Sequence, residues 1–142
     1  MPMEERSLAQ IAAEVEFERQ GPVRRALKAV IINPLANYLP AWLLRKLLHF
    51  GKSELAAANW ADPGGWRSMV ISYHGKPTQV ADRLLVGGGT MSMALRNRKR
   101  LGSRILAALI DAGGDEETHV LCLGAGPGQI IVEAMSLANT PC

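Results

Sequence analysis

The stretch HVLCLGAGPGQIIVE, His119–Glu133, decides the expected fold. It joins a short apolar run, Val120–Leu123, to three alternate glycines, Gly124, Gly126 and Gly128, and then to apolar residues at helical spacing. A continuous apolar run of this length is typical of a strand that is buried on both faces of a parallel sheet. The order strand, glycine turn, helix therefore predicts backbone N–H groups at a helix N-terminus, with no side chains in the way of a bound ligand.

The composition is that of a globular protein with a core. Of 142 residues, 48% are hydrophobic and 20% are charged, and the net charge is only +3, which does not by itself favour nucleic acid as a partner. The chain has no long apolar run for a membrane span and no visible secretory signal. Its two cysteines, Cys122 and Cys142, are too few for a disulfide framework or for a set of four metal ligands. We expect a cytoplasmic protein without a metal site.

The residues before the apolar run follow a helical pattern. Pro34 is expected to close one helix and Pro40 to break the next, while Ser53 is a candidate N-cap. Residues 62–73 are ambiguous between helix and strand, and we favour helix. The expected helices are Glu4–Arg19, Val23–Ile32, Leu35–Phe50, Ser53–Trp60, Asp62–Tyr73, Pro77–Val86, Met91–Ala112 and Gln129–Ala138. We expect a helical N-terminal region over residues 1–112 and a second domain that starts at residue 113.

The spacing of the glycines distinguishes between nucleotide-binding motifs. A dinucleotide fingerprint, G-x-G-x-x-G, needs glycine where this chain has Gln129, and a P-loop needs a lysine that does not follow here. The sequence G-x-G-x-G after an apolar strand instead resembles motif I of the class I S-adenosylmethionine-dependent methyltransferases. This resemblance covers about ten residues and the helix that commonly precedes the first strand in that family.

The resemblance implies an α/β fold: a helical N-terminal region followed by the first β-α unit of a Rossmann-like methyltransferase domain. It implies S-adenosylmethionine as cofactor, with the glycine loop beneath its methionine and ribose portion. The implied cofactor-binding residues are Cys122, Gly124, Ala125, Gly126 and Gly128. The family usually has an acidic residue two places before the first glycine, and Cys122 stands there instead, so that polar contact is missing or made differently.

The position of the motif adds a further expectation. In the family, an acidic residue after the second strand holds the ribose, and later loops hold the adenine and the substrate. Few residues follow Gly128, so we expect the N-terminal part of a longer methyltransferase that does not transfer methyl groups alone. A Rossmann-type nucleotide-binding oxidoreductase and a non-catalytic helical module for interaction with a partner or a membrane surface remain as alternatives.

Three other features were candidates for function. The basic run Arg96, Arg98, Lys99, Arg100 and Arg104 is interpreted as a solvated helix face, and docking of an acidic or phosphate-bearing substrate is the less favoured alternative. On the same helix, Leu95, Ile105, Leu106 and Leu109 are expected to face inward. The helix Leu35–Phe50 is expected to pack in the core, with contact to a membrane surface or a lipid-like methyl acceptor less favoured. His49, His74 and His119 have no assignable carboxylate partner from spacing, so no catalytic residue is predicted.

Overall fold

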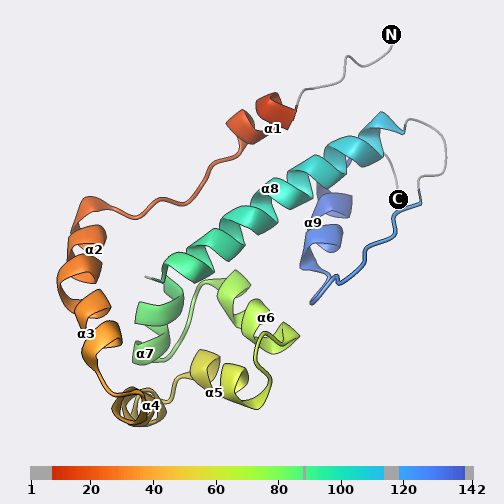
Figure 1. The fold of residues 1–142 in the computed structure, drawn as a ribbon. Helices are drawn as coiled ribbons and strands as arrows, with labels where there is room; N and C mark the ends of the chain where they lie inside the picture. Colours follow the sequence, from red (N-terminus) through yellow and green to blue (C-terminus); the bar gives the residue numbers. More distant parts are fainter. Residues whose placement is uncertain (1–7, 88, 114–118, 140–142) are drawn as a thin grey trace. The chain divides into compact units, whose positions relative to one another are not determined.

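The computed structural model describes residues 8–87, 89–113 and 119–139, and every regular element in these ranges is helical (Figure 1). The chain divides into two units. Unit 1 comprises Met1–Phe17 and Arg96–Cys142, and unit 2 comprises Glu18–Leu95. The predicted domain boundary between residues 112 and 113 stays a prediction.

The elements of unit 2 follow one another with short connections. They are α2 (Pro22–Leu27), the wide π-helical turn η1 (Lys28–Ile32), α3 (Asn33–Tyr38), α4 (Ala41–Phe50), α5 (Glu54–Ala61), α6 (Trp66–His74), α7 (Val80–Asp82) and a second π-helical turn, η2 (Arg83–Gly87). The long helix α8 (Thr90–Ala112) begins in unit 2 and continues in unit 1, which also holds α1 (Leu8–Glu14) and α9 (Gln129–Leu137).

The first elements of unit 2 form one continuous helical rod from Pro22 to Tyr38. The expectation that Pro34 ends a helix is wrong, because the backbone stays helical on both sides of it. A proline inside a helix lacks an N–H donor and its ring collides with the carbonyl four residues earlier. The wide turn η1 ends at Ile32, two residues before Pro34, and the N–H of Asn33 donates to the carbonyl of Lys28, five residues back. This wider turn relieves the crowding that Pro34 causes.

Local signals place several other helix ends as predicted. Leu39 is extended before Pro40, and α4 begins directly after Pro40. At the start of α5, the Ser53 hydroxyl accepts a hydrogen bond from the N–H of Ala56 at 3.0 Å, as an N-cap should. Residues 66–74 are helical, which confirms the favoured interpretation of the ambiguous segment, although α6 starts at Trp66 rather than at Pro63.

The α/β fold class is wrong for the described part of the chain. No residue in the described ranges is in a strand, and residues 119–123 form an irregular segment in place of the expected first strand. Leu121 and Leu123 are 85% and 86% exposed, rather than buried in a sheet. A strand is held by hydrogen bonds to a neighbouring strand. The other described elements are helices, whose backbone N–H and C=O groups already form hydrogen bonds within each helix. The described chain is therefore all-α and has no Rossmann-like sheet.

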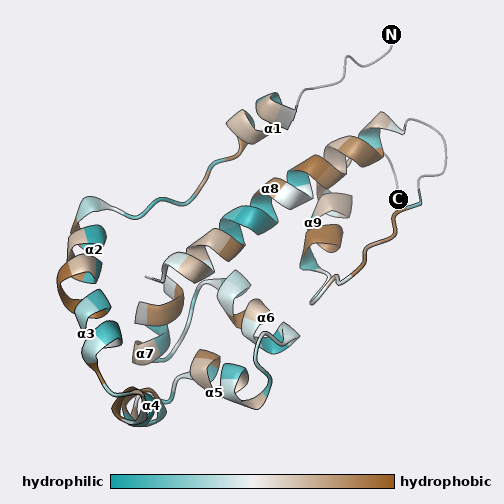
Figure 2. Ribbon diagram, viewed as in Figure 1, coloured by the Kyte–Doolittle hydropathy of each residue, from teal (hydrophilic) through white to brown (hydrophobic). Residues whose placement is uncertain are grey.

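The inward face of α8 also differs from the expectation. Its buried side chains are Ser92, Arg96, Ser103, Ala107 and Ile110, a stripe with helical spacing that is polar over much of its length. Figure 2 shows the hydrophilic middle of α8 and the more apolar stretch towards its C-terminal end. Leu109, which was expected to face inward, is exposed, whereas Arg96 is only 9% exposed. The interpretation of the basic run as a solvated face is therefore wrong for Arg96.

Candidate cofactor-binding turn

The glycine turn lies between the irregular segment and α9. Gly124, Gly126 and Gly128 have φ angles of 67°, 56° and 68°. This is the left-handed region, where any residue with a Cβ atom is strained. The N–H of Gly128 donates to the carbonyl of Ala125 at 3.1 Å, and the carbonyl of Gly128 accepts from the N–H of Ile131 at 3.0 Å. The three glycines are therefore required by the path of the backbone into the helix.

The space around the turn is open. A Cβ atom built on Gly124 or on Gly128 would meet no atom within 4 Å. Packing within the chain therefore does not explain these two glycines, and their positive φ angles do. The volume that a side chain would occupy is left available to a ligand at the N-terminus of α9. The first N–H groups of any α-helix have no acceptor in their own helix, so this end of α9 is suited to a negatively charged group.

Helix α9 is positioned by contacts with α8 in unit 1. A Cβ atom built on Gly102 would lie 3.5 Å from Cγ2 of Ile130, so the two helices pack closely at this glycine. Lys99 Nζ lies 2.8 Å from Glu133 Oε2. Ala134 is fully buried. The turn is thus connected to a helix with a defined packing surface.

The C-terminal end of α9 is attached to α8 by a second contact. The backbone N–H of Asn139 donates to Asp111 Oδ1 at 2.8 Å, and its side-chain amide donates to Asp111 Oδ2 at 2.9 Å. Asp111 lies in the last turn of α8 and Asn139 follows α9, while Gly102, in the middle of α8, lies next to Ile130 at the start of α9. The two helices therefore run in the same direction.

The structure places all five predicted cofactor-binding residues in this one segment. Cys122 is an exposed free thiol, and Gly124, Ala125 and Gly126 are also exposed, whereas Gly128 is partly covered. The acidic position of motif I, here Cys122, therefore faces solvent. Cys142 lies outside the described residues.

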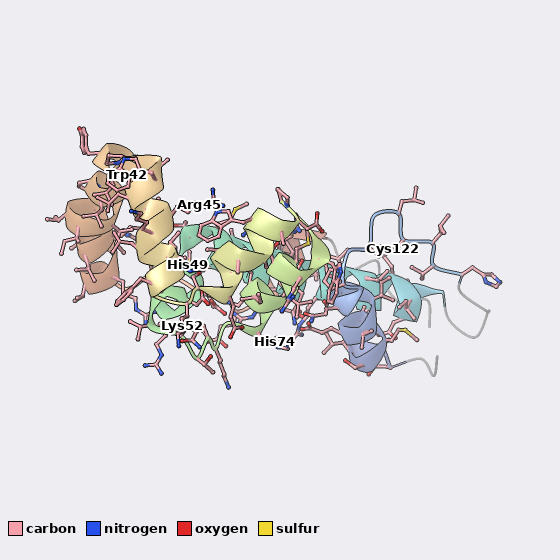
Figure 3. All side chains as sticks on the ribbon, turned by 90° about the horizontal axis from the view of Figure 1, so that it is seen from below. Trp42, Arg45, His49, Lys52, His74 and Cys122 are labelled. Carbon is pink, nitrogen blue, oxygen red and sulfur yellow. The ribbon has the colours of Figure 1, made fainter. Side chains whose placement is uncertain are left out.

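The three histidines are spread along the sequence: His49 and His74 are far from this turn, and His119 lies three residues before Cys122. His49 and His74 are exposed and belong to unit 2 (Figure 3). His119 is exposed and belongs to unit 1. Within the described ranges, no group of three or more His, Cys, Asp or Glu side chains has an arrangement that could hold a metal ion. In the basic run, the Arg100 guanidinium donates to the backbone carbonyl of Glu16 at 3.0 Å, so it joins α8 to the segment after α1.

One buried polar cluster was not predicted. Asp82 is only 1% exposed, and its carboxylate accepts hydrogen bonds from the Ser53 hydroxyl at 2.5 Å and from the N–H of Glu54 at 2.7 Å. Ser53 was identified as a cap from the sequence, but its partner 29 residues later carries no local signal. The hydrogen bonds among these three residues lie at the N-terminus of α5. They provide the Asp82 carboxylate with hydrogen-bond donors, which explains how this charged group can be buried.

Comparison with known proteins does not assign the chain to a family. No protein-family model, curated protein or solved structure matches it. A functional assignment therefore depends on the chain's own residues.

Proposed function

We propose that this chain belongs to a cytoplasmic S-adenosylmethionine-dependent methyltransferase and that the turn Cys122–Gly128 receives the methionine and ribose portion of the cofactor. The observation that carries the proposal is the run of three alternate glycines with positive φ, with open space where Gly124 and Gly128 would carry side chains. The turn leads directly into the N-terminus of α9. The methyl acceptor is a small molecule or a lipid-like compound.

The chemistry of the turn fits this ligand. S-adenosylmethionine supplies an electrophilic methyl group on a positively charged sulfur, and its methionine part also carries a carboxylate. Helix α9 has no acidic residue in its first turn, so no side chain there competes with an incoming carboxylate for the N–H groups. The glycines let the backbone approach the ligand closely, which a side chain would prevent. In this proposal the residues of the turn bind and orient the cofactor, and they exchange no proton with it.

The proposal is tested by titrating the labelled 142-residue chain with S-adenosylmethionine and recording amide NMR spectra. We expect shifts of the amides of Gly124, Gly126, Gly128 and Gln129 at millimolar ligand, which corresponds to a binding free energy of about −4 kcal/mol. The affinity is weak because the turn is exposed and the position of the family's acidic residue holds Cys122.

The control variants separate a binding role from backbone strain. Gly126→Val should abolish the shifts, because the side chain occupies the space beneath the ligand. Gly64→Val introduces the same kind of strain at a positive φ of 76°, in unit 2 and far from the turn in sequence, and should leave the shifts unchanged. Absence of shifts in the unaltered chain would refute the proposal. Equal shifts with a nicotinamide dinucleotide would favour the oxidoreductase alternative.

A further inference from the structure

The charges of the chain are distributed unevenly along the sequence. Between Glu18 and Glu54 there is no acidic residue, while seven Lys and Arg side chains lie in this interval. The rest of the chain has nine basic and thirteen acidic residues, so it is net negative. The acid-free interval holds α2, η1, α3 and α4, which belong to unit 2. The positive charge of this protein is therefore concentrated on these helices.

The same helices expose their large apolar side chains. No side chain described in α2, η1, α3 or α4 is buried. This contradicts the expected core packing of Leu35–Phe50. Tyr38 and Phe50 are 86% and 89% exposed, and Trp42 is 61% exposed. Leu43, Leu44 and Leu48 are only partly covered. An exposed set of this size is more than scattered apolar residues on a monomer surface, and it points to a binding surface.

The wide turn η1 aligns the apolar residues of the rod. Large apolar side chains recur at every fourth residue from Val23 through Leu27 and Ile31 to Leu35, and Tyr38 follows. In a regular α-helix with 3.6 residues per turn, a repeat of four would drift around the axis. A π-helical turn holds more residues per turn, so it reduces this drift. The stripe therefore stays closer to one face of the rod, with Arg24 and Lys28 beside it.

Helix α4 has the same mixture of residues. Lys46 lies 5.4 Å from the ring centre of Trp42, and Arg45 lies 5.3 Å from that of Trp60. In Figure 3, Trp42, Arg45, His49 and Lys52 follow one another along α4 and the turn after it. Aromatic rings next to basic side chains are the combination that suits the interface between lipid headgroups and acyl chains.

We propose that the exposed surface of α2, η1, α3 and α4, called here the basic apolar surface, docks on an anionic lipid membrane. The apolar side chains enter the headgroup region, and the basic side chains meet acidic headgroups, each adding to the affinity. In this proposal the helices lie along the membrane surface. No described helix is long and apolar enough to cross a membrane. A second copy is a poor occupant, because two such surfaces would bring like charges together.

The test is sedimentation of the full chain with lipid vesicles. The chain should sediment with vesicles of phosphatidylcholine and phosphatidylserine, much less with phosphatidylcholine alone, and less at high salt, because the headgroup attraction is screened. Neutralising one basic residue of the rod and one of α4 in Lys28→Gln/Lys46→Gln should lower the vesicle affinity by about thirtyfold, since each charge contributes about a fivefold factor. Phe50→Ser should lower it by about tenfold.

Matched controls lie in the same unit outside the basic apolar surface. Arg67→Gln/Lys76→Gln removes two exposed positive charges from α6 and the segment after it, and Val80→Ser removes an exposed apolar side chain from α7. Neither should change the vesicle affinity. Equal binding to both kinds of vesicle, no binding, or equal losses in the control variants would overturn the proposal. Self-association that the Phe50→Ser change abolishes, measured by analytical ultracentrifugation without lipid, would also overturn it.

Discussion

Removal of the Asp82 side chain tests how the buried cluster holds unit 2 together. In Asp82→Ala, the Ser53 hydroxyl and the N–H of Glu54 lose a charged acceptor at 2.5 Å and 2.7 Å. Hydrogen bonds to a charged group contribute about 1.5 kcal/mol or more each, so the free energy of unfolding should fall by about 3 kcal/mol. Asp82→Asn keeps the shape and one oxygen acceptor, and should cost about half as much. Urea unfolding followed by far-ultraviolet circular dichroism measures both changes.

The control for this prediction is Glu54→Ala. Glu54 is an exposed acidic residue in the first turn of the same helix, so the change removes a favourable interaction with the helix dipole but leaves the cluster intact. The expected loss is about 0.3–1 kcal/mol. A double-mutant cycle of Ser53→Ala with Asp82→Ala should give a coupling energy of about 1 kcal/mol or more, because the two side chains share one hydrogen bond. A loss for Asp82→Ala no larger than that for Glu54→Ala would refute the reasoning.

Three further predictions concern packing and the glycine segment. Gly102→Ala should raise the free energy of unfolding by about 0.5–1 kcal/mol, because alanine favours the helix interior and its Cβ would make an ordinary contact with Ile130; a destabilised variant would contradict the observed spacing of the helices. Gly51→Ala should lower the free energy of unfolding, because the added Cβ would lie only 2.9 Å from the Cβ of Ala81. A higher free energy of unfolding would show that the neighbouring residues move apart without cost. Hydrogen exchange at Val120–Leu123 should be fast, since these residues form no strand, and slow exchange would indicate pairing.

Local sequence signals predicted most helix positions. The cap at Ser53, the stop at Pro40 and the start of the last helix at Gln129 depend on residues within one turn of each end, so a single sequence reveals them. Pro34 was misjudged, because its cost depends on whether the preceding turn widens. For the candidate site, the sequence predicted the position of the turn and explained its glycines by the close approach of a ligand. The positive φ angles supply a separate reason for glycine, and the binding role stays a prediction.

Features that depend on distant residues were not predictable in this way. The apolar run at residues 120–123 has the composition of a buried strand, but a strand exists only when a second strand accepts its hydrogen bonds. The inward face of α8 was also misjudged, since apolar residues occur around much of this helix and the burial of Arg96 and Ser103 depends on tertiary contacts. The same holds for Asp82, whose partners are far away in the sequence.

The sequence by itself determined most of the helix positions, the glycine turn and the concentration of positive charge between Glu18 and Glu54, because caps, turn glycines and charges are properties of neighbouring residues. Only the tertiary structure decided that residues 119–123 form no strand, that Asp82 closes the start of α5, and that Tyr38, Trp42 and Phe50 stay exposed. The physical reason is that strand pairing and burial are relations between segments, and their free energy depends on which surfaces meet.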